Sequence, residues 1–149
     1  MRGNFRRLVQ RSLNATQQRV KAATLSGRAF FDQGAAAQAL AAHKLPGCFI
    51  DFETIQFAVP VWPSTRPYQQ MPFQFSVHRL GRTGQVKHQA FLDLSGNNPS
   101  RPFAQALIAA CGQRGPVFVY NAAFETSRIR ELAECHPRLA PALHAINER

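Results

Sequence analysis

Two acidic residues, Asp51 and Glu53, lie two positions apart in the segment 48–54. The apolar residues before them predict a buried strand, and side chains two apart on a strand point to the same face, so Ile50 and Phe52 would pack on the other. Carboxylates on one face repel each other unless a cation lies between them, and oxygen ligands of this kind suit Mg²⁺ or Mn²⁺. The pattern therefore predicts a metal site. The alternative is that the two acids merely end the strand in solvent.

A third carboxylate, Glu125, follows a second apolar segment, 117–120. That segment does not alternate, which is typical of a strand covered on both faces. Asn121 can cap the helix that follows it, and on that helix Glu125 shares a face with Ile129 and Leu132. We therefore expect a buried carboxylate that requires a partner. A purely structural alternative is that the helix N-terminus stabilises the anion, by about 0.3 to 1 kcal/mol.

Four further charged residues on the same helix are spaced so that they can form ion pairs. They are Arg128, Arg130, Glu131 and Glu134. Because exposed pairs of this kind contribute little to stability, we interpret them as a solvated face.

The first 45 residues are predicted to form two helices that lie ahead of the metal-site strand. Asn14 or Thr16 can cap the first helix, which Gly27 would end, and Asp32 can cap an Ala-rich second helix ending near Lys44. The pattern divides the chain into a basic helical segment, 1–45, and a domain, 46–149.

Within the domain, hydrophobic periodicity predicts further strands and helices. Strands are expected at 73–80 and 85–94, a helix at 100–113, a strand at 117–120, a helix to about 135 and a last helix from Pro137. Three strands joined by short connections, then helix, strand and helix, predict an α/β fold that opens as a ribonuclease H-like mixed sheet.

The connection between the first two strands is rich in proline and aromatic residues from Pro60 to Pro72. It is too long and too aromatic for a neutral linker, so we expect it to pack on the domain or to contact substrate. Arg66 with Tyr68 could hold a phosphate and stack a base.

These motifs together resemble a known family. Asp51-x-Glu53, and Asn121-x-x-Phe124-Glu125 after a later strand, resemble the first two motifs of the DEDD-type 3′ to 5′ exonucleases. With the segment 65–78 added, residues 14 to 149 are similar to a bacterial domain-of-unknown-function family regarded as predicted nucleases.

The resemblance implies two-metal hydrolysis of phosphodiester bonds in DNA or RNA, with one or two Mg²⁺ or Mn²⁺ ions held by the acids Asp51, Glu53 and Glu125. It also implies that four further residues bind substrate. These are Arg66, Tyr68, Gln70 and Asn121.

The chain departs from the exonuclease pattern in two respects. Its second motif ends in Glu instead of Asp, and no fifth strand with a following His or Tyr and Asp precedes Arg149; His144 and Glu148 are interpreted as solvated. We therefore expect an incomplete copy or a fragment of a larger protein, with weak binding and little turnover on its own. The alternative is a non-catalytic nucleic-acid-binding module. A sheet without its fifth strand would offer an exposed edge for self-association.

Composition favours a polyanionic partner. The 149 residues include 18 Lys and Arg against 8 Asp and Glu, which gives a net charge of +10. Such an excess favours nucleic acid through counterion release, although the charge could instead serve only solubility.

The cysteines and the N-terminal residues indicate the cellular compartment of the protein. Cys48, Cys111 and Cys135 are too widely spaced to indicate a disulfide framework or a zinc site, so we expect a reducing cytoplasm. No apolar run approaches the roughly 18 residues that a membrane span needs. Residues 1–31 carry seven basic and no acidic side chains, a bias shared by nucleic-acid-binding arms and transit peptides.

Overall fold

Residues 13–149 are described by a computed structural model, in which the chain divides into two units, one ending at Ala42 and one spanning His43–Arg149. Four of the seven basic residues noted in the segment 1–31 lie outside the described residues, namely Arg2, Arg6, Arg7 and Arg11.

The first unit contains α1 (Ala15–Ser26) and α2 (Gln33–Ala41). Asn14 caps α1 in a capping box with Gln17: each side chain accepts a 2.9 Å hydrogen bond from the other's backbone N–H. Gly27 ends the helix with a positive φ of 68°, a conformation that glycine adopts without a steric cost. Both helices were predicted with their caps, although α2 ends earlier than expected. Neither helix buries a residue.

The second unit is built on a four-stranded sheet with the order β3-β2-β1-β4. Its strands are β1 (Gly47–Ile55), β2 (Met71–Leu80), β3 (Val86–Leu92) and β4 (Val117–Val119). β2 pairs antiparallel with both β1 and β3, whereas β4 pairs parallel with β1. The predicted mixed α/β fold, with its order of three strands, helix, strand and helix, is confirmed.

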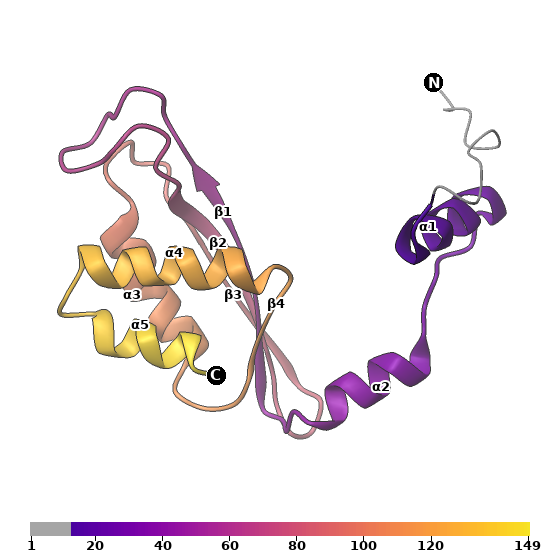
Figure 1. Ribbon diagram of the computed structural model, residues 1–149. Coiled ribbons are helices and arrows are strands. Elements are labelled where there is room, and N and C mark those ends of the chain that lie inside the picture. Colours follow the sequence, from indigo (N-terminus) through magenta and orange to yellow (C-terminus); the bar gives the residue numbers. More distant parts are fainter. Residues whose placement is uncertain (1–12) are drawn as a thin grey trace. The chain divides into compact units, whose positions relative to one another are not determined.

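Three helices cover one face of this sheet (Figure 1): α3 (Ser100–Cys111), α4 (Ala122–Cys135) and α5 (Ala140–Asn147). The core lies between them and the sheet, and Phe103 of α3 is at its centre. Its ring makes edge-to-face contacts with Phe52 at 5.6 Å, Phe75 at 5.4 Å and Phe91 at 5.9 Å, measured between ring centroids. Aromatic burial of this kind dominates the stability of a small domain.

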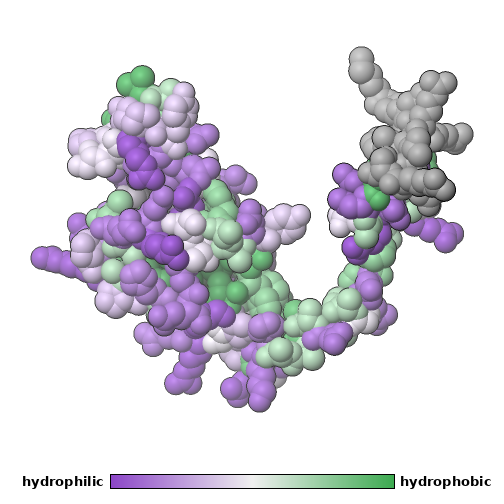
Figure 2. All heavy atoms as spheres, in the orientation of Figure 1, coloured by the Kyte–Doolittle hydropathy of each residue, from purple (hydrophilic) through white to green (hydrophobic). Residues whose placement is uncertain are grey.

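No described helix of the second unit packs on the other face, which we call the uncovered face. Phe49 of β1 lies there, stacked on Phe118 of β4 at 4.8 Å, and His78 of β2 is stacked on His88 of β3 at 4.3 Å. Figure 2 shows hydrophobic residues between hydrophilic ones in the region of β1 and β4. The uncovered face thus carries rings from all four strands.

The strand β4 differs from the prediction. We expected cover on both faces, but all three of its residues are only half-buried. The reason is its place at the edge of a sheet with one uncovered face. The outward N–H of Val117 donates to the carbonyl oxygen of Arg149 at 3.3 Å, so the last residue of the chain lies beside this edge.

Replacing Phe103 by alanine tests the core. We expect Phe103→Ala to lower the free energy of unfolding by about 3 to 5 kcal/mol, because it removes a fully buried ring and leaves a cavity. Urea denaturation followed by circular dichroism measures the loss. Leu94→Ala, at a position 81% exposed, is the control and should change stability by less than about 0.5 kcal/mol. Equal effects of the two variants would contradict this assignment of the core.

Candidate functional site

Asp51 and Glu53 lie in the middle of β1, on the uncovered face. Their partners across the antiparallel ladder are Ser76 and Gln74 of β2, whereas Phe52, between them, is buried on the covered face. The prediction that both carboxylates share one face is therefore confirmed. The strand continues beyond these residues to Ile55, so the alternative, in which the two acids end the strand, is wrong. Over residues 13–149, neither carboxylate has a hydrogen-bond or ion-pair partner.

Glu125 is buried in the first turn of α4, with only 4% of its surface exposed. Its Oε2 atom is fully buried and has no hydrogen-bond partner. The helix N-terminus favours an anion, but that gain is small beside the cost of burying an unpaired carboxylate oxygen. The expected buried carboxylate is thus present, and its partner is missing from the described part of the chain.

One aromatic contact between β1 and α4 is made by residues next to the three acids in the sequence. Phe52 lies between the two β1 acids, and its ring centroid is 6.0 Å from that of Phe124, the neighbour of Glu125. The carboxylates nevertheless lie on different sides, since Asp51 and Glu53 are on the uncovered face and Glu125 is among the helices. No three His, Cys, Asp or Glu side chains of residues 13–149 are close enough together to hold a metal ion.

The proline-rich connection is packed on the domain. Trp62 donates from Nε1 to the carbonyl oxygen of Gly96 at 3.0 Å, and its ring contacts Phe57. Tyr68 donates its backbone N–H to the carbonyl oxygen of Phe57 at 2.8 Å. One of the two predictions for this segment, that it packs on the domain, is therefore confirmed.

A charged cluster ties the end of this connection to α4. Glu131 accepts from Arg128 at 2.9 Å and from Arg66 at 3.2 Å, and Arg128 also donates to the side chain of Gln70. The side chains of Arg128 and Glu131 are only 15% and 23% exposed. Our interpretation of these two as a solvated face is therefore wrong, because the connection covers them; Arg130 and Glu134 are exposed as expected.

The remaining predicted substrate contacts are both at the surface. Tyr68 is 66% exposed and has a φ of 56°, a left-handed backbone conformation that is rare for a bulky residue and occurs mostly at functional or tightly constrained positions. Asn121 caps α4 as predicted, its side-chain oxygen accepting from the N–H of Phe124 at 3.4 Å. Its amide is thus already used in part by the helix.

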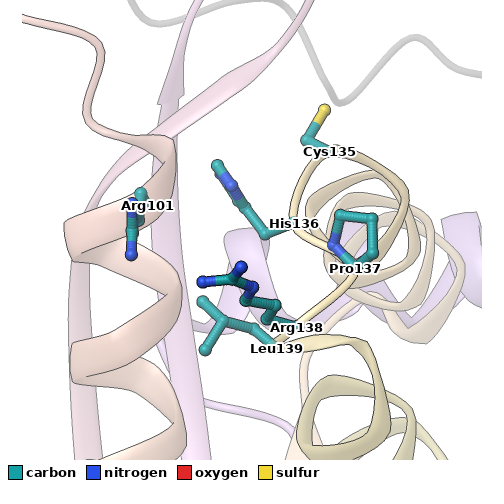
Figure 3. Close-up of a pocket in the computed structure, with 6 residues that line it drawn as sticks. All are labelled: Arg101, Cys135, His136, Pro137, Arg138 and Leu139. Atoms are coloured by element: carbon teal, nitrogen blue, oxygen red, sulfur yellow. The ribbon is translucent and has the colours of Figure 1, made fainter.

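Sequence reasoning missed a pairing between α3 and the end of α4. Ser100 Oγ and His136 Nε2 share a hydrogen bond of 2.9 Å, and beside them lies a cavity of about 270 Å³. Figure 3 shows His136 and Arg138 pointing from the α4–α5 connection toward α3, which carries Arg101. Burial, followed by the positive charge of Arg101, lowers the pKa of His136. Residues so far apart in the chain carry no spacing signal that could have revealed this group.

Fold and site together define a mixed α/β domain, with a four-stranded sheet covered on one face and acids on its central strand. Residues 48–149 match a described family, so the chain belongs to the family called domain of unknown function (DUF2779). No curated protein and no solved structure matches the chain. Among the helices of residues 13–149, none is long and apolar enough to cross a membrane.

The charged cluster yields a prediction. Glu131→Gln should lower the free energy of unfolding by about 1 to 2 kcal/mol, because it leaves the half-buried guanidinium of Arg128 without its anion. Hydrogen exchange should also become faster at the N–H of Tyr68. The matched control is Glu134→Gln, which removes the same charge from an exposed position of α4 and should change stability by less than about 0.5 kcal/mol. Unchanged exchange at Tyr68 would contradict a role of this cluster in holding the connection.

Proposed function

We propose that the chain carries a metal-dependent nuclease domain of the ribonuclease H-like type, which hydrolyses phosphodiester bonds of DNA or RNA. The strand order supports this proposal, because β1 is central, antiparallel to β2 and parallel to β4, and it carries both Asp51 and Glu53. The resemblance to the first two exonuclease motifs supports it as well. The three free cysteines favour a reducing compartment such as the cytoplasm.

The observation that carries the proposal is the unpartnered Oε2 atom of Glu125. Buried polar atoms are nearly always paired, and an unpaired charged oxygen is more costly than a neutral one. A cation bound to this oxygen would remove the cost. Since the junction from β4 to α4 follows directly on the β1–β4 pair Ile50–Val119, Glu125 lies on the element that begins beside Asp51.

The donor chemistry fits Mg²⁺ or Mn²⁺, since Asp51, Glu53 and Glu125 all offer hard carboxylate oxygens. Such an ion supplies a Lewis acid that activates water and stabilises the charge of the leaving oxygen. Because Glu125 lies on the covered side of the sheet, at least one carboxylate side chain must turn when the ion binds. The acids would hold the ion, and the hydrophobic contact of Phe52 with Phe124 would position them.

Roles in substrate binding are assigned to four residues. Arg66 and Tyr68 lie in the packed connection, where the exposed ring of Tyr68 could stack on a base and the guanidinium of Arg66 could reach a phosphate. Gln70 accepts a hydrogen bond from Arg128, and Asn121 caps α4. The role of both residues would therefore be to orient neighbouring groups. The net charge of +10 supports a polyanionic substrate.

A second function, nucleic-acid binding without catalysis, is favoured by one observation. The rings of Phe49, Phe118, His78 and His88 form two stacked pairs on the uncovered face, and aromatic side chains on a sheet are a common platform for unpaired bases. The open edge at β4 would in addition suit a further strand, from the rest of a larger protein or from a second copy of the chain.

Metal binding is tested by thermal unfolding with and without Mn²⁺. Glu125→Gln should stabilise the protein in chelator by about 1 kcal/mol or more, since it neutralises a buried unpaired oxygen, and it should abolish the stabilisation by Mn²⁺. For the unsubstituted chain that stabilisation reaches about 2.7 kcal/mol at a hundredfold excess of ion over Kd.

Glu134→Gln, at an exposed position of the same helix, is the control and should leave the response to Mn²⁺ unchanged. If Glu125→Gln destabilises the protein in chelator, the carboxylate has an internal partner and the metal assignment is wrong.

Catalysis is tested with residues 1–149. Labelled single-stranded and double-stranded DNA and RNA are incubated with Mg²⁺ or Mn²⁺. We expect weak binding and slow metal-dependent cleavage, and Asp51→Asn should lower the rate at least about a hundredfold, because an interaction with the metal is removed.

Cleavage by Asp51→Asn as fast as by the unsubstituted protein would overturn the assignment of Asp51. If the protein binds nucleic acid in the presence of metal and cleaves none of the four substrates, the binding function is the correct one.

A further inference from the structure

An open cavity between α3 and the α4–α5 connection is lined by two arginines and a histidine. It has a volume of about 270 Å³, near the lower end of the range for small-ligand sites. Its walls are Arg101, Cys135, His136, Pro137, Arg138 and Leu139. No acidic side chain lines it. In Figure 3 the sulfur of Cys135 points away from the other side chains, and the remaining polar side-chain groups that line the cavity are two guanidinium groups and one imidazole.

Neither arginine of this cavity has a counterion. Within residues 13–149 the acid Glu131 is shared by Arg66 and Arg128, but no carboxylate pairs with Arg101 or Arg138. Two cations facing one space repel each other, and an anion in that space converts the repulsion into two attractions. A guanidinium group presents paired N–H donors whose geometry matches phosphate oxygens.

The imidazole of His136 is held in place by a hydrogen bond. Its Nε2 atom is hydrogen-bonded to Ser100 Oγ at 2.9 Å, and Ser100 is buried at the start of α3. The positive charge of Arg101 reaches the ring, because it contributes to lowering the pKa of His136. An anion beside the ring would act in the opposite direction. The ring is thus oriented, and it is close enough to Arg101 to belong to the same electrostatic site.

We propose that Arg101, His136 and Arg138 form a binding site for a phosphate group. Two exposed guanidinium groups without counterions and an oriented ring line a space of suitable size, and the walls formed by Pro137 and Leu139 can contact the group esterified to the phosphate. The ligand is either a free or terminal phosphate or an internal phosphate of a nucleic-acid strand. Both present the same oxygens to the two arginines.

This site is separate from the acids of β1 and α4. Glu125 is in the first turn of α4 and Cys135 is its last residue, which places them about 15 Å apart at the helical rise of about 1.5 Å per residue. The phosphate site therefore requires no metal ion, and it can be tested while the proposed nuclease chemistry is switched off.

The experiment is a titration of the full chain in buffer that contains a chelator. The ring signals of His136 are followed by NMR while inorganic phosphate, a 5′-phosphorylated oligothymidylate or the same oligomer with a 5′-hydroxyl is added. We expect saturable shifts of these signals. Arg138→Gln and Arg101→Gln should each raise Kd at least about tenfold, the loss expected for one charge-assisted hydrogen bond.

Arg130→Gln is the matched control, since it removes the same charge from an exposed position of α4 outside the cavity, and it should raise Kd less than about twofold. Tighter binding of the phosphorylated oligomer than of the hydroxyl form identifies a terminal phosphate as the ligand, and equal binding identifies internal phosphates. The absence of saturable shifts with all three probes overturns the proposal. An equal loss in Arg130→Gln and Arg138→Gln does so too, because it would reduce the effect to general surface charge.

Discussion

The alternation of side chains along β1 is the constraint on which the rest of this structure depends. β1 is paired on both sides, so its residues have only two directions available, and Ile50 and Phe52 take the one that leads into the core. Asp51 and Glu53 are thereby forced to the opposite face. A slip of the strand by one residue would bury two carboxylates and expose the apolar pair, which no rearrangement of the helices could offset. The same packing that stabilises the domain thus places its acids.

Local signals in the sequence were reliable because their physics is local. Asn14 and Asp32 cap helices through hydrogen bonds to residues three positions away, and the alternation around Phe75 reports a sheet with one buried face. The burial of a residue by segments distant in the chain was not predictable in this way. Glu131 has the spacing of an exposed ion-pair residue, and only the path of the proline-rich connection removes it from solvent.

The candidate site likewise has features that could be predicted from the sequence and features that could not. The shared face of Asp51 and Glu53 follows from the period of a strand, and the burial of Glu125 follows from the period of a helix, so both could be predicted. Their separation by the sheet could not, because it depends on which face the helices cover. The cavity with His136 and Arg138 could not be predicted from the sequence either, because one of its walls comes from α3, a segment distant in the chain.

The uncovered face affects how separate copies of the chain interact in solution. Rings such as Phe49 and exposed apolar side chains such as Leu92 are present on it, and surfaces of this kind attract each other at short range. The opposing force is the mutual repulsion of chains that each carry a net charge of +10, which acts over about 8 Å at physiological ionic strength and about 3 Å at 1 M salt. Dissolved copies of the chain are therefore kept apart by electrostatic repulsion, and concentrated salt weakens that repulsion without weakening the attraction.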